Sequence, residues 1–307
     1  MSVTRFEQMR LDEVSSQPVV TPWPKPGFNV PVMPAGLMQL ASTGQVEVQI
    51  NHMMAAMFAA QMGAAAEITI SWALEQARAF SNKTLAEFGA LVRFAQNKAS
   101  QQGLFDLLGR QITQTCGESS LDFSDKRKDL AASILKLDPL AVQVFVLETL
   151  WATEWMSHAC RNTNSMSHQA VPGLLATERR IDAELRGVLK KMIEVTAAAY
   201  GSNETRRAAS DLRAIYGLTA QMAAHFAASY TGLTEIIWAT EPFTADRRAL
   251  FASFEGVASR TCARPTDQLP RLVEFLSGVN QGDRLLWMAG DDESHTEAVT
   301  PFLKESA

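Results

Sequence analysis

Apolar positions recur at helical intervals along most of this chain, and no segment shows the sustained two-residue alternation of a β-strand. The clearest case is Val48–Ala66, which contains no charged residue and lies between Glu47 and Glu67. The pattern predicts one long helix over Gln45–Phe80 and a second over Ser81–Gln114. We therefore expect an all-α protein, built as a bundle of long helices.

Prolines and polar stretches divide this helical pattern. Six prolines fall between Pro18 and Pro34, which indicates an extended arm that packs on its own domain or tethers a partner. Ser124 is placed to cap a helix at its start, and Gly201 is placed to end one as a C-cap. The other predicted helices are Leu140–Ala159, Thr177–Tyr200, Arg206–Ala239, Asp246–Thr261 and a last helix that Thr266–Leu269 opens and that runs to about Leu276.

A short internal similarity suggests a further level of organisation. Met54–Ala60 reads MAAMFAA and Met222–Ala228 reads MAAHFAA, each followed by an acidic residue and then a Trp. A true repeat would give two related helical hairpins around a central helical section, whereas alanine-rich helices also match by chance. The predicted units are an arm at 1–44, a first hairpin at 45–117, a central section at 118–217, a second hairpin at 218–289 and an acidic tail at 290–307.

Composition indicates a globular chain, because 47% of its 307 residues are hydrophobic and 20% are charged. The formal net charge of -5 argues against a nucleic-acid-binding surface, which needs clustered basic residues. The three cysteines are widely spaced, and the N-terminus lacks the apolar core of a secretory signal. Val48–Ala66 contains several polar residues and much Ala. We therefore expect a cytoplasmic protein that does not span a membrane.

The strongest candidate for chemistry lies on the apolar helix, where Glu148, Glu154 and His158 accompany Trp151 and Trp155. Glu154 and His158 share a helix face, so they can share a proton or a metal ion. Di-metal carboxylate bundles instead use Glu-x-x-His on two helices, a pattern that this chain lacks. We therefore predict no catalytic residues, no metal and no cofactor, and keep a ligand cavity at these five residues as an alternative.

The segment Leu74–Gln111, LEQARAFSNKTLAEFGALVRFAQNKASQQGLFDLLGRQ, resembles phasins, the proteins that coat bacterial polyhydroxyalkanoate granules. The resemblance covers Trp72–Gln111 and, less closely, Met222–Leu276. The chain departs from phasins in its greater length, its proline-rich arm and its Trp-rich central helix. The resemblance implies a non-enzymatic, all-helical protein that adsorbs to a hydrophobic polyester surface or to partner helices and self-associates as a homo-oligomer.

Soft and bulky apolar side chains on the first long helix are the candidates for contact with such a surface. Two other hypotheses remain open. One is a helical-bundle enzyme or ligand-binding protein with a cavity by the Trp-rich helix, and the other is a scaffold subunit of a larger assembly. The predicted surface-binding residues are Met54, Met57, Phe58, Met62, Ile68 and Trp72.

Overall fold

The computed structural model describes residues 45–79, 84–115, 124–162, 170–238 and 270–279. Within these ranges 91% of the residues are helical and no strand occurs, which confirms the predicted all-α fold class. For some helical stretches, among them 45–58 and 153–162, the backbone alone is described. The predicted arm, the acidic tail and the helix over Asp246–Thr261 lie outside the described residues.

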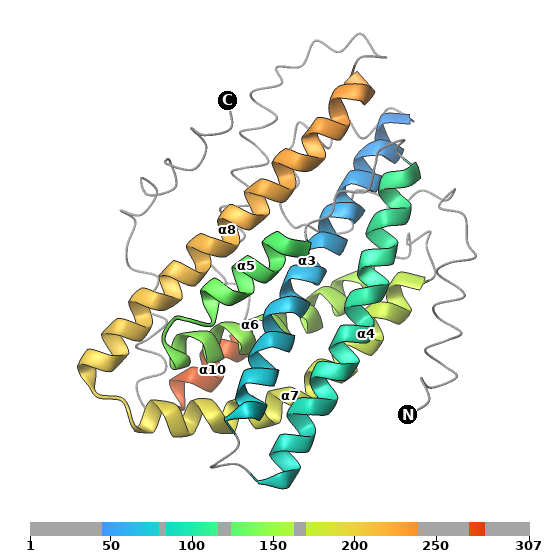
Figure 1. Ribbon diagram of the computed structural model, residues 1–307. Coiled ribbons are helices and arrows are strands. Elements are labelled where there is room, and N and C mark those ends of the chain that lie inside the picture. The colour runs from blue at the N-terminus through green and yellow to red at the C-terminus, as the bar shows by residue number, and fades with distance from the viewer. Residues whose placement is uncertain (1–44, 80–83, 116–123, 163–169, 239–269, 280–307) are drawn as a thin grey trace.

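Two long helices, α3 (Gln45–Arg78) and α4 (Leu85–Thr115), pack side by side and form the α3–α4 hairpin (Figure 1). The predicted long helix over Gln45–Phe80 is thus present, whereas α4 begins later than Ser81. Thr84 sets this start through a capping box with Glu87. The Glu87 N–H donates to Thr84 Oγ1 at 3.2 Å, and the Thr84 N–H donates to the Glu87 carboxylate at 2.9 Å.

The central helix of the remaining bundle is α6, which contacts both α7 and α8. Every residue from Leu140 to Glu148 is buried, as its nearly unbroken apolar sequence predicts. The hairpin packs against this group of helices, with α4 on α7 and with α3 on α5 and α8 (Figure 1). The helices after the hairpin are α5 (Ser124–Ile134), α6 (Pro139–Asn162), α7 (Ala170–Ala198), α8 (Ser202–Trp238) and α10 (Pro270–Ser277).

Gly201 has a different role from the predicted C-cap. Helix α7 already ends at Ala198, and Gly201 instead precedes α8. Its carbonyl accepts the Thr205 N–H at 3.0 Å, and its own N–H donates to Glu204 Oε2 at 3.1 Å. Gly201 therefore caps the start of α8, because the glutamate follows it at the spacing of a capping box.

Helix α8 is continuous through residues 217 and 218, where the sequence pattern placed a boundary between two units. Gly217 lies inside the helix, and a methyl group built at this position would meet no atom within 4 Å. A glycine in a helix lowers its stability by about 1 kcal/mol without ending it. None of the helices in the described ranges is both long and apolar enough to cross a membrane.

Candidate functional site

The structure places half of the predicted surface-binding residues in the core. Met62, Ile68 and Trp72 are 3%, 3% and 1% exposed, because neighbouring helices cover this part of α3. They do not form the exposed apolar face that the sequence pattern suggested, so an external surface could reach them only after the bundle opens. The other three residues of the set lie in 45–58, where side chains are not described.

Two residues of the alternative cavity, Glu148 and Trp151, are buried on α6. The Trp151 ring packs edge-on against Phe275 of α10, with ring centroids 6.3 Å apart. Lys190 Nζ lies 4.9 Å from the Trp151 ring centroid and 5.0 Å from that of Phe275. The side chains of Phe275 and Lys190 therefore pack against the Trp151 ring. The other three predicted cavity residues lie in 153–162, where the backbone alone is described.

Glu148 is paired with Tyr216 of α8. The Tyr216 hydroxyl donates to Glu148 Oε2 at 2.8 Å, and its ring packs edge-on against Phe145 at 6.3 Å. Burial raises the pKa of Glu148 to about 8, although the hydrogen bond from Tyr216 opposes the shift. Burial and the neighbouring carboxyl also raise the pKa of Tyr216. The pair is therefore largely neutral at pH 7 and joins α6 to α8 without burying a full charge.

A second buried group, the Lys98 cluster, consists of Lys98 on α4 with Glu178 and Asp182 on α7. All three are at most 1% exposed. Lys98 Nζ contacts Glu178 Oε1 and lies 2.7 Å from Asp182 Oδ1. Burial lowers the pKa of Lys98, but the two carboxylates outweigh this effect and hold the pKa above its ordinary value. Lys98 is therefore a charged ammonium, not a neutral amine that could act as a base or nucleophile.

A further ion pair also joins the hairpin to the rest of the bundle. Arg127 Nη1 on α5 lies 2.6 Å from Asp106 Oδ1 on α4, and Arg127 is buried. Its guanidinium lies directly over Gly63 of α3, where a Cβ atom would come within 1.9 Å of Arg127 Nη1. Glycine at this position therefore gives the guanidinium its space. Sequence reasoning identified neither this pair nor the Lys98 cluster.

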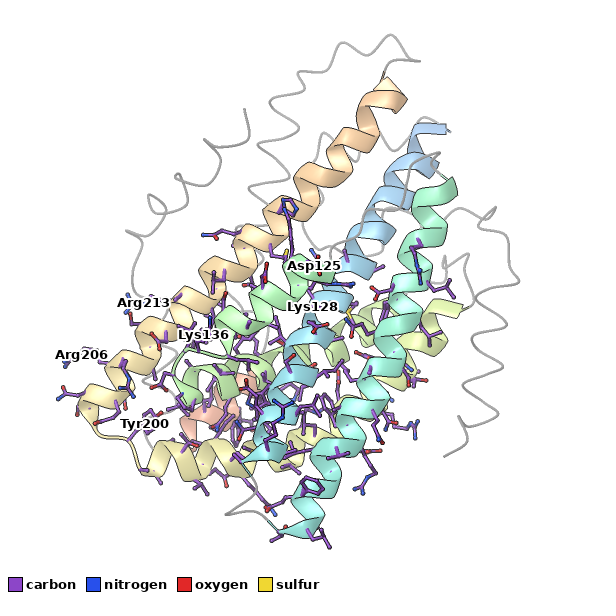
Figure 2. The ribbon with its side chains drawn as sticks, viewed as in Figure 1. Asp125, Lys128, Lys136, Tyr200, Arg206 and Arg213 are labelled. Atoms are coloured by element: carbon purple, nitrogen blue, oxygen red, sulfur yellow. The ribbon has the colours of Figure 1, made fainter. Side chains whose placement is uncertain are left out.

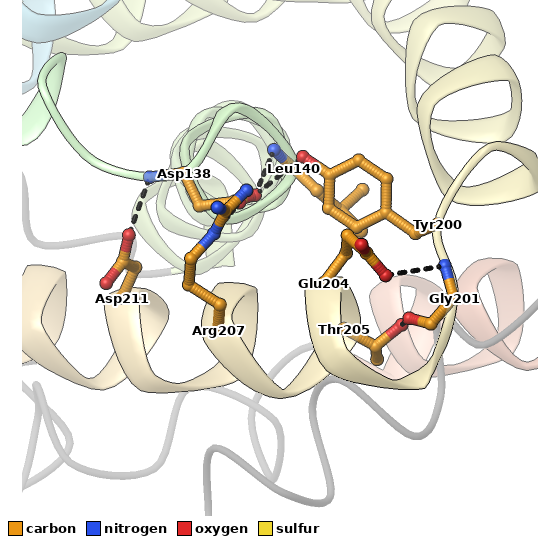
Figure 3. A network of polar contacts seen from close by, with 8 residues as sticks. All are labelled: Asp138, Leu140, Tyr200, Gly201, Glu204, Thr205, Arg207 and Asp211. Atoms are coloured by element: carbon orange, nitrogen blue, oxygen red, sulfur yellow. Dashed lines mark hydrogen bonds and ion pairs between the residues drawn. The ribbon is translucent and has the colours of Figure 1, made fainter.

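Asp138 organises a further polar network, at the start of α6 (Figure 3). Its Oδ1 accepts the Leu140 N–H at 3.0 Å and the Tyr200 hydroxyl at 2.9 Å. Its Oδ2 binds Arg207 Nη2 at 3.0 Å, and its N–H donates to Asp211 Oδ2 at 2.8 Å. Burial and the bond to Asp138 raise the pKa of Tyr200 to about 12. Asp138 thus caps α6 and connects it to the α7–α8 junction.

These groups link helices and do not assemble a reactive centre. In the part of the chain that the structure describes, no group of three or more His, Cys, Asp or Glu residues could hold a metal ion. The carboxylates of the Lys98 cluster bind an ammonium, and the Glu148 carboxyl binds a hydroxyl. Both groups therefore hold neighbouring helices in register.

A comparison of the chain with protein-family models, with curated proteins and with solved structures finds no match. The resemblance to phasins therefore depends on the sequence of Trp72–Gln111 and Met222–Leu276 alone.

Proposed function

We propose that the protein is a non-enzymatic, phasin-like interaction protein that binds a hydrophobic surface, such as a polyhydroxyalkanoate granule, and self-associates. The observation that supports this proposal is the composition of the buried part of α3. It extends over about five helical turns, is covered by α4, α5 and α8, and consists mainly of small and soft side chains. Apart from Ala59, which faces Gly109 of α4, the buried apolar residues of this stretch are Ala60, Met62, Ala64, Ala66, Ile68, Trp72, Ala73 and Ala77.

Side chains of this kind suit an apolar surface of irregular shape. Ala lets the helix backbone approach closely, and Met adjusts its shape because it is unbranched and polarizable. Trp72 adds a large apolar area. Because the same side chains are buried in the closed bundle, binding requires the α3–α4 hairpin to expose its inner face. Contact with the apolar surface then removes that face from water again, which offsets the cost of opening.

The outer helices fit the same role. Glu184, Lys191 and Glu194 on α7 and Arg206 on α8 are exposed. Charged side chains on the outside of a coated particle keep particles apart and dispersed in water. We accordingly propose a cytoplasmic protein that associates with granules, in which the hairpin meets the apolar phase and the charged helices face the solvent.

Co-sedimentation of the full chain with polyhydroxybutyrate particles tests this proposal, with polar beads of the same size as the control. We expect saturable binding to the polyester that persists at about 1 M salt, because salt screens charge interactions but strengthens apolar contact. Equal binding to both particles, or binding that disappears in salt, would contradict the proposal. Concentration-dependent assembly without polyester binding would instead favour the scaffold hypothesis.

A further inference from the structure

Among the described residues, two ionic contacts join the α3–α4 hairpin to the rest of the bundle, and the hairpin carries the positive charge in one and the negative charge in the other. At the first, the hairpin contributes the cation Lys98 and α7 contributes the anions Glu178 and Asp182. At the second, the hairpin contributes the anion Asp106 and α5 contributes the cation Arg127. This alternation fixes the position of the hairpin, because a shift along the helix axes would separate both sets of charges.

The same contacts reduce the free energy needed to separate the interface. The Lys98 cluster buries one positive and two negative groups away from water. Glu178 Oε2 and the nearby Gln101 Oε1 are buried with no hydrogen-bond partner among the described residues. Opening returns all of these groups to water together, which recovers their hydration. An apolar interface of the same area would have no such compensation.

The hairpin also contributes apolar side chains to this interface. Leu91, Ala95 and Phe105 lie at helical spacing from Lys98 and are buried, so they share the side of α4 that carries the cluster. Once Lys98 is hydrated, this side of α4 together with the part of α3 that packs on α5 and α8 offers a largely apolar strip. The flexible Lys98 side chain can extend from it toward water.

We propose that the chain opens at this ionic interface, and that the face of the intact α3–α4 hairpin uncovered there is the one that binds an apolar polymer surface. The inference rests on the proposed function for the identity of the partner, whereas the opening itself is independent of it. The Lys98 cluster then sets how often the face is uncovered. The surface that binds the polymer and the ionic cluster that governs its exposure therefore lie on the same side of the hairpin.

Thiol labelling measures this opening without any particle. In a chain whose three cysteines are replaced by Ser, Ala95→Cys reports on the ionic interface and Ala141→Cys reports on α6; both alanines are buried. If the hairpin opens while the rest stays folded, Cys at position 95 should react at least about tenfold faster than Cys at position 141. Equal rates at the two positions would overturn the inference, because they would mean that only global unfolding exposes the interface.

Variants of the Lys98 cluster should shift the labelling rate in opposite directions. Lys98→Met leaves two carboxylates without their cation, so labelling at position 95 should accelerate by about a hundredfold. The triple variant Lys98→Met, Glu178→Met and Asp182→Leu makes the contact apolar and should slow labelling by about tenfold. A triple variant that labels as fast as the parent would overturn the role of the cluster, even if Lys98→Met fails to fold.

Two controls match these variants. Lys128→Met removes a basic side chain from the exposed pair with Asp125 on α5, labelled in Figure 2, whose side chains are 62% and 94% exposed. It should leave labelling unchanged. Ala59→Cys with Gly109→Cys should form a disulfide that joins α3 to α4, since a Cβ atom at position 109 would lie 3.6 Å from that of Ala59. This bond should preserve both labelling and polyester binding, and loss of either would show that α3 and α4 separate.

Co-sedimentation of the same variants with polyhydroxybutyrate separates this inference from the proposed function. We expect the triple variant to bind about tenfold more weakly than the parent, in step with its slower labelling. Polyester binding that the triple variant does not weaken would leave the proposed function intact and overturn the inference. Selective opening with no polyester binding by any variant would refute the proposed function and the assignment of this face to an apolar partner.

Discussion

Replacing Glu148 by Gln is expected to change how the stability of the protein depends on pH. Burial raises the pKa of Glu148 to about 8 in the folded chain, from an ordinary value of 4.5. Between these two values the folded chain holds the proton and the unfolded chain releases it, so the free energy of unfolding falls as pH rises. The contribution of the protonated Glu148 to stability is complete below its pKa in the unfolded chain, 4.5, and is lost by about pH 9. The loss between pH 5 and pH 8 amounts to about 3 to 4 kcal/mol.

Glu148→Gln removes this titration and keeps the contact with α8. The amide oxygen can accept the Tyr216 hydroxyl, which donates to Glu148 Oε2 at 2.8 Å in the parent. Urea unfolding, followed by circular dichroism at several pH values, should show that the stability of the variant relative to the parent grows by about 3 to 4 kcal/mol from pH 5 to pH 8. Glu184→Gln, at an exposed position on α7, is the matched control and should change the relative stability little.

Parallel stability curves for the parent and Glu148→Gln would refute this reasoning. They would mean that Glu148 is hydrated in the folded protein, so that its carboxyl ionises as it does in the unfolded chain. Tyr216→Phe offers a second comparison, because it removes the hydroxyl that stabilises the carboxylate. It should move the pH-dependent loss of stability to higher pH, since the bond from Tyr216 lowers the pKa of Glu148.

Three further substitutions test the buried contacts, each by urea unfolding. Asp138→Ala should lower the free energy of unfolding by about 2 kcal/mol, because it removes the α6 cap. Asp138→Asn keeps the cap and loses only the ion pair with Arg207, which is 66% exposed, so it should cost less than about 1 kcal/mol. Equal losses for the two variants would contradict the capping role of Asp138. Thr84→Ala should cost about 1 kcal/mol and Thr84→Ser much less, so similar effects would count against the capping box. Met62→Asp should destabilise the bundle by more than about 3 kcal/mol because its side chain is buried, and near-parental stability would place Met62 outside the core.

The helices could largely be predicted from the sequence because helical periodicity is a local property. Long apolar periods define α3 and α6, and Pro139 marks the first turn of α6. The start of α4 was also present in the sequence, since Thr84 and Glu87 stand at the spacing of a capping box. Gly201 was misread because a glycine between two helices can cap either one, and the decision depends on Glu204 beyond it.

The candidate site was less accessible to sequence reasoning. An apolar strip looks the same in sequence whether it meets another helix or a foreign surface, so the burial of Trp72 depends on tertiary packing. The Lys98 cluster left a recognisable signal. Lys98 interrupts the apolar side of α4, and Glu178 and Asp182 stand in line with Leu185 on α7. Opposite charges within two apolar helix faces predict that the faces pack together. A single sequence does not show which of several such faces pair with one another.

The buried polar groups divide the bundle into parts that respond to different perturbations. The Glu148–Tyr216 pair joins α6 to α8, and the Asp138 network joins α6 to the α7–α8 junction, so both act within the group of helices that follows the hairpin. The Lys98 cluster instead joins that group to the hairpin. A rise in pH from 5 to 8 should therefore weaken the α6–α8 contact and leave the ammonium of Lys98 charged, because its pKa is raised. Substitutions in the Lys98 cluster should release the hairpin while α6 and α8 remain paired. If the two perturbations acted on every helix equally, the bundle would be one cooperative unit and the hairpin could not open by itself.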